Sequence, residues 1–255
     1  MKRKYPILEF DKNRAAMIEP GVSVKRNHDM PERCVICFFQ DVINDLSQKG
    51  QISEIAHLKS EMGSHSVYRM KGVEPAMALL HPGVGAPLAV GLLEEVIALG
   101  CRKFIACGGA GTLDSSHEVG KLIVPIAAIR DEGTSYHYLP PDREVAPTNL
   151  ALEAIKTTLA NSGVPYELTK TWTTDAIYRE TKIKINLRRE EGCACVEMEA
   201  AALFAVARFR NVELAQILYA GDDLSGEFWD SRNWDDRQEI REELLKVAVR
   251  ACCIL

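Results

Sequence analysis

Two glutamates that flank a methionine, in Val196-Glu197-Met198-Glu199, are the residues of this sequence best suited to chemistry. They precede the run AALFAVA (201–207), which is apolar on every side and is therefore expected to be buried. A buried carboxylate needs hydrogen-bond partners, and the two neighbouring hydroxyls of a sugar can supply them. The alternative, weighted equally, is helix capping, because an acidic residue in the first turn interacts favourably with the helix dipole.

A second acidic pair, Asp222 and Asp223, follows Gly221 at the end of the apolar segment 213–220. An aspartate at the end of a strand is well placed for general-acid catalysis, whereas the alternative is a plain turn. Residues 131–138 follow another apolar segment and mix aromatic with polar side chains. That mixture suits stacking and hydrogen bonding to a flat base, although an ordinary surface loop has the same composition.

Three glycines, Gly108, Gly109 and Gly111, follow the apolar segment 103–107. Glycines allow the backbone to approach a ligand closely, and successive backbone N–H groups can bind an anion. A tight connection from a strand to a helix uses glycines as well, and we weigh the two interpretations equally. The spacing is not G-x-G-x-x-G, so we do not predict a dinucleotide site.

Short apolar segments alternate along the chain with longer amphipathic ones, a pattern typical of an α/β domain. The pattern predicts strands at 34–39, 77–80, 103–107, 121–129, 166–172 and 213–220, and helices at 40–49, 87–99, 149–161, 179–191, 199–209 and 235–253. Ligands of open α/β sheets bind beyond the carboxyl ends of the strands. Four segments lie at such ends, and we expect them to converge on one site: 81–85, 108–112, 197–199 and 221–223.

The composition indicates an ordinary globular protein of 255 residues, with 47% hydrophobic and 26% charged residues and a net charge of −5. We predict a single domain over residues 1–255. The absence of a basic cluster disfavours nucleic-acid binding, and no stretch approaches the roughly 20 apolar residues of a membrane helix. No signal-peptide pattern is seen, so a cytoplasmic location is expected. The eight cysteines lie mostly in apolar runs, which favours reduced, buried thiols over a metal site.

Several of these segments together resemble the nucleoside phosphorylases of the purine nucleoside and uridine phosphorylase type, a family that also includes hydrolytic nucleosidases. The resemblance covers about residues 75–225, in family order. It rests on HPGVGAPLAVGLLEEVIALG (81–100), FIACGGAGTL (104–113), VGKLIVPIAAIRDEGTS (119–135), VEMEAAALFAVA (196–207) and AGDD (220–223). It implies a three-layer α/β domain whose mixed, barrel-like central sheet is flanked by helices. It also implies a homo-oligomer, either a dimer or a hexamer built as a trimer of dimers.

The resemblance further implies a role for each site residue. Glu199 would hold the ribose 2′- and 3′-hydroxyls, Met198 would pack against the sugar, and Glu197 would border the site. Asp222, or in second place Asp223, would protonate the leaving base. The other substrate-binding positions would be Gly83 and Gly85 as a wall near the sugar, Gly108 and Gly109, and Thr174, Asp175, Ile177, Tyr178 and Arg179 around the base. No metal and no organic cofactor is implied; phosphate would be a co-substrate.

The chain departs from the family at the positions that bind phosphate. The Gly-Asp-Pro-x-Arg turn is replaced by residues 38–42 (FFQDV), a second arginine by Ala106, and a hydroxyl residue by Gly109. Around residues 57–65, where a neighbouring subunit supplies a third arginine, Lys59 is the cation, and residues 5–10 lack the family's N-terminal histidine.

Three activities therefore stay open. We predict phosphorolysis to a free base and ribose 1-phosphate, the family's commonest activity. Hydrolysis by water is a nearly equal alternative, because the usual phosphate-binding arginines are missing, and nucleoside binding without catalysis is a third. Asp222 favours a purine, whereas AIRDEGTSYHYLPP (127–140) resembles the uridine-cleaving branch.

Overall fold

The computed structural model describes residues 2–255, which form ten strands and seven α-helices. The strands are β1 (Arg33–Cys37), β2 (Ile52–Ser60), β3 (Gly63–Met70), β4 (Met77–Leu80), β5 (Lys103–Thr112), β6 (Leu122–Asp131), β7 (Glu144–Val145), β8 (Tyr166–Thr174), β9 (Cys193–Glu197) and β10 (Glu213–Asp223). The helices are α1 (Pro20–Ser23), α2 (Gln40–Gln48), α3 (Ala86–Leu99), α4 (Asn149–Ser162), α5 (Lys182–Glu190), α6 (Ala200–Arg210) and α7 (Gln238–Ile254).

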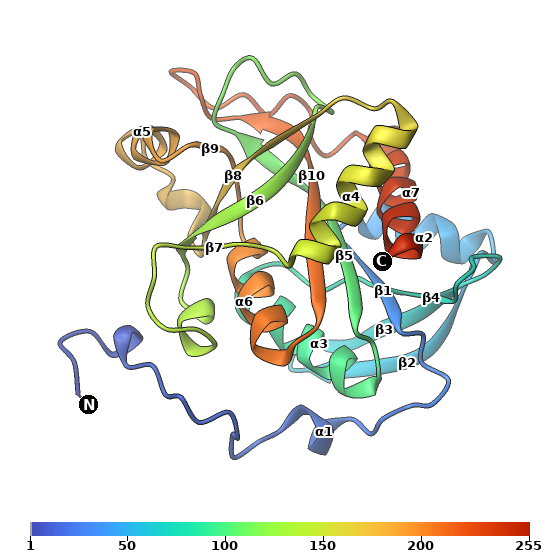
Figure 1. The fold of residues 1–255 in the computed structure, drawn as a ribbon. Helices are drawn as coiled ribbons and strands as arrows, with labels where there is room; N and C mark the ends of the chain where they lie inside the picture. Colours follow the sequence, from blue (N-terminus) through green and yellow to red (C-terminus); the bar gives the residue numbers. More distant parts are fainter. Residues whose placement is uncertain (1) are drawn as a thin grey trace.

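Five strands close into a ring at the centre of the molecule (Figure 1). The order along the sheet is β10-β6-β8-β9-β5-β1-β4-β3-β2, and β10 also pairs with β5, which completes the ring. β5 runs parallel to β1 and β10 but antiparallel to β9, so the sheet is mixed. The predicted barrel-like sheet is confirmed.

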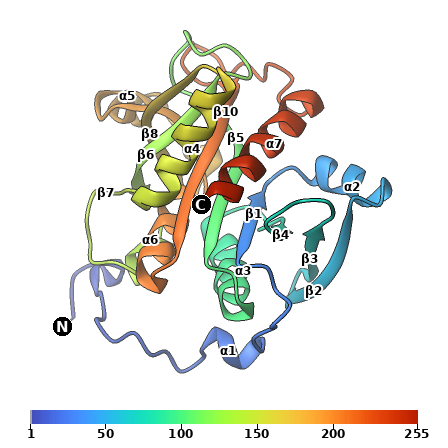
Figure 2. The same cartoon turned by 45° about the vertical axis from the view of Figure 1, so that its right-hand side comes forward.

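Helices cover both faces of the sheet, because neighbouring residues of a strand point to opposite sides. Ile36 and Ala106 belong to an apolar cluster with α3 and α6, whereas Val35 and Ile105 belong to a second cluster with α2, α4 and α7. The three-layer arrangement is therefore as predicted. β2, β3 and β4 extend the sheet away from the ring, beside α2 (Figure 2).

The glycine cluster does not end its strand, which corrects the prediction of a turn leading to a helix. β5 continues through Gly108, Gly109 and Gly111 to Thr112. Its first half pairs with β1 as far as Cys107, and its last two residues pair with β9. Glycines suit this stretch because other side chains approach the backbone closely: a Cβ atom at Gly108, Gly109 or Gly111 would lie 3.2, 3.2 or 2.5 Å from Phe38, Tyr219 or Leu224, respectively.

The remaining differences are local. The β2–β3 hairpin was not predicted, because a register shift between Glu54 and Ala56 breaks the regular alternation of apolar residues. The helix predicted over 179–191 begins only at Lys182, after a short 3-10 turn at Ile177–Arg179. All eight cysteines are free thiols, and all except Cys253 are buried. Within residues 2–255, no helix is long and apolar enough to cross a membrane.

Candidate active site

The structure brings the four predicted strand ends together around the bend of β5. The backbone N–H of Gly85 donates to Glu199 Oε1 at 2.6 Å. The Phe38 ring lies against Gly108, and a Cβ atom added to Gly111 would lie 3.3 Å from Asp222 Oδ1. Residues far apart in the sequence thus border one region, because β5 leaves β1 and joins β9 at this point.

Glu199 is a buried carboxylate that faces the wall formed by residues 83–85. Its side chain is 6% exposed and makes no capping bond to α6, although Glu199 is the residue at the N-cap. The residue that donates the hydrogen bond to Glu199 is Gly85, which directly precedes α3. The φ of Gly85 is 92°, a value that suits glycine. Burial, together with the charge of Glu197, raises the pKa of Glu199 to about 8.

Glu197 performs the capping that the sequence also allowed for Glu199. Its Oε2 accepts the backbone N–H groups of Glu199 and Ala200 at 2.8 and 2.6 Å. Its Oε1 accepts the hydroxyls of Thr173 and Thr171 at 2.6 and 3.3 Å. Four donors therefore hold Glu197 in place, and Glu199 remains available to a ligand. Met198, between them, is half-buried.

The predicted phosphate region is lined by aromatic and apolar side chains. Phe39 and Ala106 are buried, and the Phe38 ring meets the His81 ring edge-on at 6.3 Å. His81 Nδ1 accepts the Gly83 N–H at 3.0 Å, and burial lowers the pKa of His81, so the imidazole is neutral at neutral pH.

Two cations are relevant to this region: Lys59, which the sequence suggested, and Arg241, which it did not. Arg241 stacks over the Phe39 ring but forms an ion pair with Asp41 at 2.9 Å. Lys59 is exposed on β2. The space beside Gly109 is taken by Tyr219, because a Cβ atom there would lie 3.2 Å from the Tyr219 ring.

The two aspartates at the end of β10 have different surroundings. Asp223 is buried and forms an ion pair with Arg232 at 2.5 Å, while its Oδ1 accepts the Ser225 N–H at 2.7 Å. Asp222 is half-buried and keeps Oδ1 beside Gly111. Burial raises the pKa of Asp222. The structure therefore favours Asp222 over Asp223 as the acid.

Two side chains beside Asp222 were not identified from the sequence. Trp229 Nε1 donates to Asp222 Oδ2 at 2.7 Å. Burial and the nearby charge of Asp222 raise the pKa of Glu180 to about 7. Glu180 directly follows the segment predicted to contact the base. This position in the chain was the one sequence feature that could have identified Glu180. No sequence pattern pointed to Trp229.

The residues predicted to contact the base lie at and beyond the end of β8. Thr174 is buried, and its hydroxyl accepts the Ala176 N–H at 3.2 Å. Asp175 ties this segment to the loop after β6 by accepting the Gly133 N–H at 2.8 Å. The side chains of Ile177, Tyr178 and Arg179 are exposed, and for Tyr178 the exposed fraction reaches 95%. Their role as base contacts stays a prediction.

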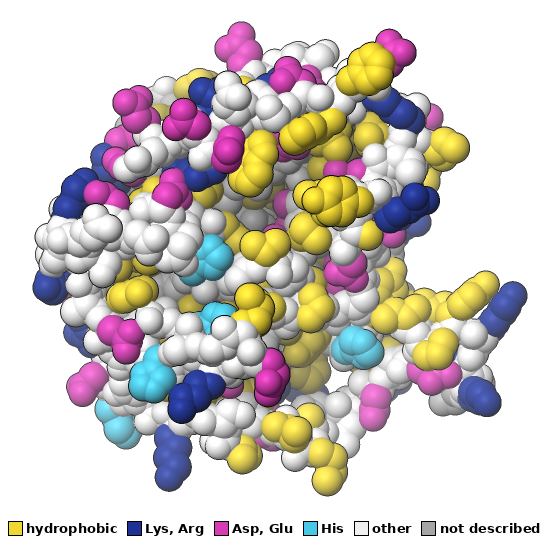
Figure 3. Space-filling model, turned by 180° about the vertical axis from the view of Figure 1, so that it is seen from behind, with side chains coloured by type: hydrophobic (Ala, Val, Ile, Leu, Met, Phe, Trp, Pro, Cys, Tyr) yellow, Lys and Arg dark blue, Asp and Glu magenta, His cyan; other side chains and the backbone are white. Residues whose placement is uncertain are grey.

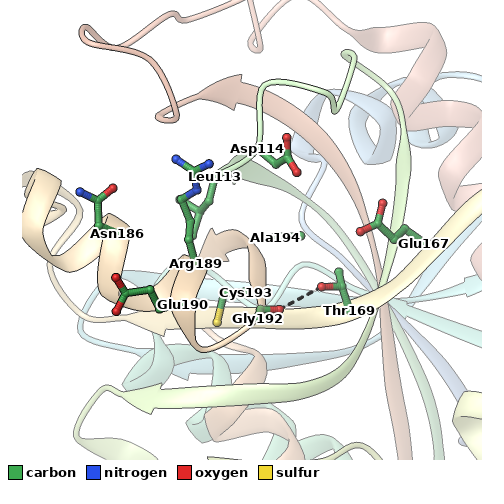
Figure 4. A pocket seen from close by; sticks show the side chains of 10 residues that line it. All are labelled: Leu113, Asp114, Glu167, Thr169, Asn186, Arg189, Glu190, Gly192, Cys193 and Ala194. Atoms are coloured by element: carbon green, nitrogen blue, oxygen red, sulfur yellow. Dashed lines mark hydrogen bonds between the residues drawn. The ribbon is translucent and has the colours of Figure 1, made fainter.

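A separate hollow of about 620 Å³ lies near the other end of β9, between α5 and the start of that strand (Figure 4). None of the predicted site residues lines it; the lining residues are Leu113, Asp114, Glu167, Thr169, Asn186, Arg189, Glu190, Gly192, Cys193 and Ala194. We therefore do not assign it to the site. On the face opposite to that of Figure 1, hydrophobic side chains with acidic ones among them surround another hollow (Figure 3).

Comparison with known families gives one match that spans nearly the whole chain. The model of the family described as the phosphorylase superfamily matches residues 32–253. This span contains every element from β1 to β10, nearly all of α7, and all the site residues named above.

Individual relatives are distant in sequence. A guanosine phosphorylase from Halorubrum lacusprofundi is 26% identical over 175 residues, which cover 68% of this chain and 73% of that protein. A uridine phosphorylase from Thermococcus kodakarensis is 28% identical over 221 residues, covering 75% and 78%. The crystal structure of a uridine phosphorylase from Vibrio fischeri has the same fold, with a TM-score of 0.75, 22% identity and coverage of 90% and 94%.

Proposed function

This chain belongs to the phosphorylase superfamily, and from that premise we propose that it cleaves the bond between the ribose and the base of a nucleoside. The observation that carries the proposal is the pair of carboxylic acids with raised pKa values, Asp222 on β10 and Glu199 just beyond β9, two strands that both pair with β5. In this proposal Glu199 binds the sugar and Asp222 protonates the base.

The two acids match the charges that develop when this bond breaks. The sugar acquires positive charge in an oxocarbenium-like transition state, which a nearby ionised carboxylate stabilises more than it stabilises the substrate. Ribose hydroxyls that donate to Glu199 would favour its ionised form on binding. The departing base acquires negative charge, and proton transfer from Asp222 removes it. Protonation of a ring nitrogen suits a purine, so we propose purine nucleosides as substrates.

We propose water as the acceptor of the ribosyl group. A phosphate dianion requires strong donors, and arginines are the usual choice. The corresponding region holds Phe38, Phe39 and Ala106, and the cation that stacks there, Arg241, is already paired with Asp41. Water needs no such cluster of positive charge.

Phosphorolysis is the second candidate, and the observation that favours it is sequence similarity. The two relatives described above, at 26% and 28% identity, are phosphorylases. In that case phosphate would bind through groups other than the family's arginines.

Chromatography of inosine, guanosine, adenosine and uridine after incubation with the protein tests the proposal, with and without phosphate. We expect base and free ribose from the purine nucleosides in both tubes. Glu199→Ala should abolish this release while the far-ultraviolet circular dichroism stays unchanged. Release that requires phosphate would support the second candidate instead, and release of base by Glu199→Ala at the normal rate would refute the site assignment.

A further inference from the structure

The segment between β10 and α7 returns to Asp222 through a short closed loop. Asp223 and Asp230 exchange two backbone hydrogen bonds, at 2.8 and 3.0 Å, and Arg232 forms an ion pair with Asp223. The loop 224–229 is thus held at its base, and Trp229 lies immediately before the closing residue. The Trp229 side chain is 61% exposed, yet its indole N–H reaches Asp222 Oδ2 at 2.7 Å.

We propose that Trp229 is a positioning residue for Asp222: its indole N–H holds Oδ2, so that Oδ1 carries the proton to the base. The inference rests on the proposed function, because it takes Asp222 as the general acid. Trp229 need not contact the reacting atoms to act in this way.

The surroundings of the other oxygen support this division of roles. Oδ1 lies beside Gly111, where a Cβ atom would come within 3.3 Å of Oδ1, 3.2 Å of Val196 and 2.5 Å of Leu224. Glycine at this position therefore leaves room for the carboxyl group against β5. One carboxyl oxygen of Asp222 thus accepts a hydrogen bond, and the other lies against a glycine of β5. These two contacts define the orientation of the carboxyl group, which proton transfer requires.

The pKa of Asp222 depends on the charges around it and on its hydrogen bond from Trp229. Asp223 on the same strand raises the pKa of Asp222, Arg232 from the loop lowers it, and Glu180 approaches from the segment after β8. The Trp229 hydrogen bond stabilises the ionised carboxylate and lowers the pKa of Asp222 against the larger effect of burial. Loss of the indole N–H should therefore raise that pKa.

Trp229→Phe removes the N–H and keeps an aromatic ring. In the purine nucleoside assay we expect kcat to fall about tenfold and the alkaline limb of the kcat profile, which reports the substrate complex, to move upward by roughly 0.5–1 pH unit, the equivalent of one hydrogen bond of ordinary strength. A lower rate combined with an upward shift is a pattern that general loss of structure does not produce. Trp234→Phe, on the same segment, is the matched control and should leave both quantities unchanged.

Nuclear magnetic resonance of the indole N–H groups tests the contact without catalysis. The resonance that disappears in Trp229→Phe should shift with pH in the wild-type protein, and it should stop doing so in Asp222→Asn. A resonance that does not titrate in the wild type would overturn the inference, as would an unchanged alkaline limb in an active Trp229→Phe variant. If the wild type cleaves no nucleoside, the proposed function fails, and the titration alone then decides whether Trp229 and Asp222 are coupled.

Discussion

Replacement of Glu199 by glutamine should lower the catalytic rate but raise the stability of the fold at alkaline pH. The charge of this carboxyl group favours catalysis, whereas its burial disfavours folding. Glutamine keeps the shape of the side chain and still accepts the Gly85 N–H through its amide oxygen. It removes the negative charge that would stabilise the positively charged sugar. By analogy with the loss of one preorganised electrostatic group, kcat/KM should fall by about 10²–10³.

The free energy of unfolding of this variant should instead exceed that of the wild type at alkaline pH. Because the pKa of Glu199 is raised to about 8 in the folded protein, the folded state holds this proton more tightly than the unfolded state does. The free energy of unfolding therefore falls as pH rises from roughly 4.5 to 8, by about 4 kcal/mol in total for a buried group. Glu199→Gln lacks this loss, so at pH 9 the variant should be more stable than the wild type, whereas at pH 4 the two should be similar.

Urea unfolding at both pH values and steady-state kinetics measure the two effects on the same preparations. Glu94→Gln is a suitable control, because Glu94 is also buried but pairs with Arg210, at 2.6 Å, away from the site. This control should lose stability at neutral pH and keep its catalytic rate. Activity of Glu199→Gln within tenfold of the wild type, or equal stability at pH 9, would refute the reasoning.

Three further predictions follow from the same contacts. The kcat/KM of the wild type should fall at both acid and alkaline pH, because Glu199 in the free protein must lose its proton to accept ribose hydroxyls whereas Asp222 must keep its proton for the base; a profile that falls on one side alone would contradict this. Glu197→Ala should lower the free energy of unfolding by about 2–4 kcal/mol in urea titrations, since it leaves the hydroxyls and N–H groups of its four contacts without their acceptor. Gly111→Ala should reduce kcat at least tenfold in the base-release assay, because its Cβ would displace Leu224 and Asp222; Gly91→Ala, which has open space around it, is the control.

The sequence predicted the fold well because the periodicities of the core are strong. Segments such as 87–99 and 103–107 carry apolar residues at clear helical or strand spacing, and their tertiary contacts agree with their local preferences. The β5 glycines illustrate the limit of that reasoning. The local sequence allows both a turn and a bent strand, and the choice depends on β9, which joins β5 from about 80 residues further along the chain.

The sequence predicted which segments lie together, but not which contacts their side chains make. Glu197 and Glu199 differ by two positions, and either could have capped α6. Glu197 caps α6 because Thr171 and Thr173 on β8 donate two further hydrogen bonds to its carboxylate. The sequence does not specify these two contacts. The Trp229 contact depends on the path of an irregular loop, for which no periodic pattern exists.

The most direct test of the account is to follow inosine cleavage in saturating phosphate by proton and phosphorus-31 nuclear magnetic resonance, which distinguishes free ribose from ribose 1-phosphate in one sample. The account predicts hypoxanthine and free ribose in equal amounts, with no signal from ribose 1-phosphate. Ribose 1-phosphate as the sole sugar product would contradict the assignment of water as the acceptor, and unchanged inosine would contradict the assignment of purine nucleosides as substrates.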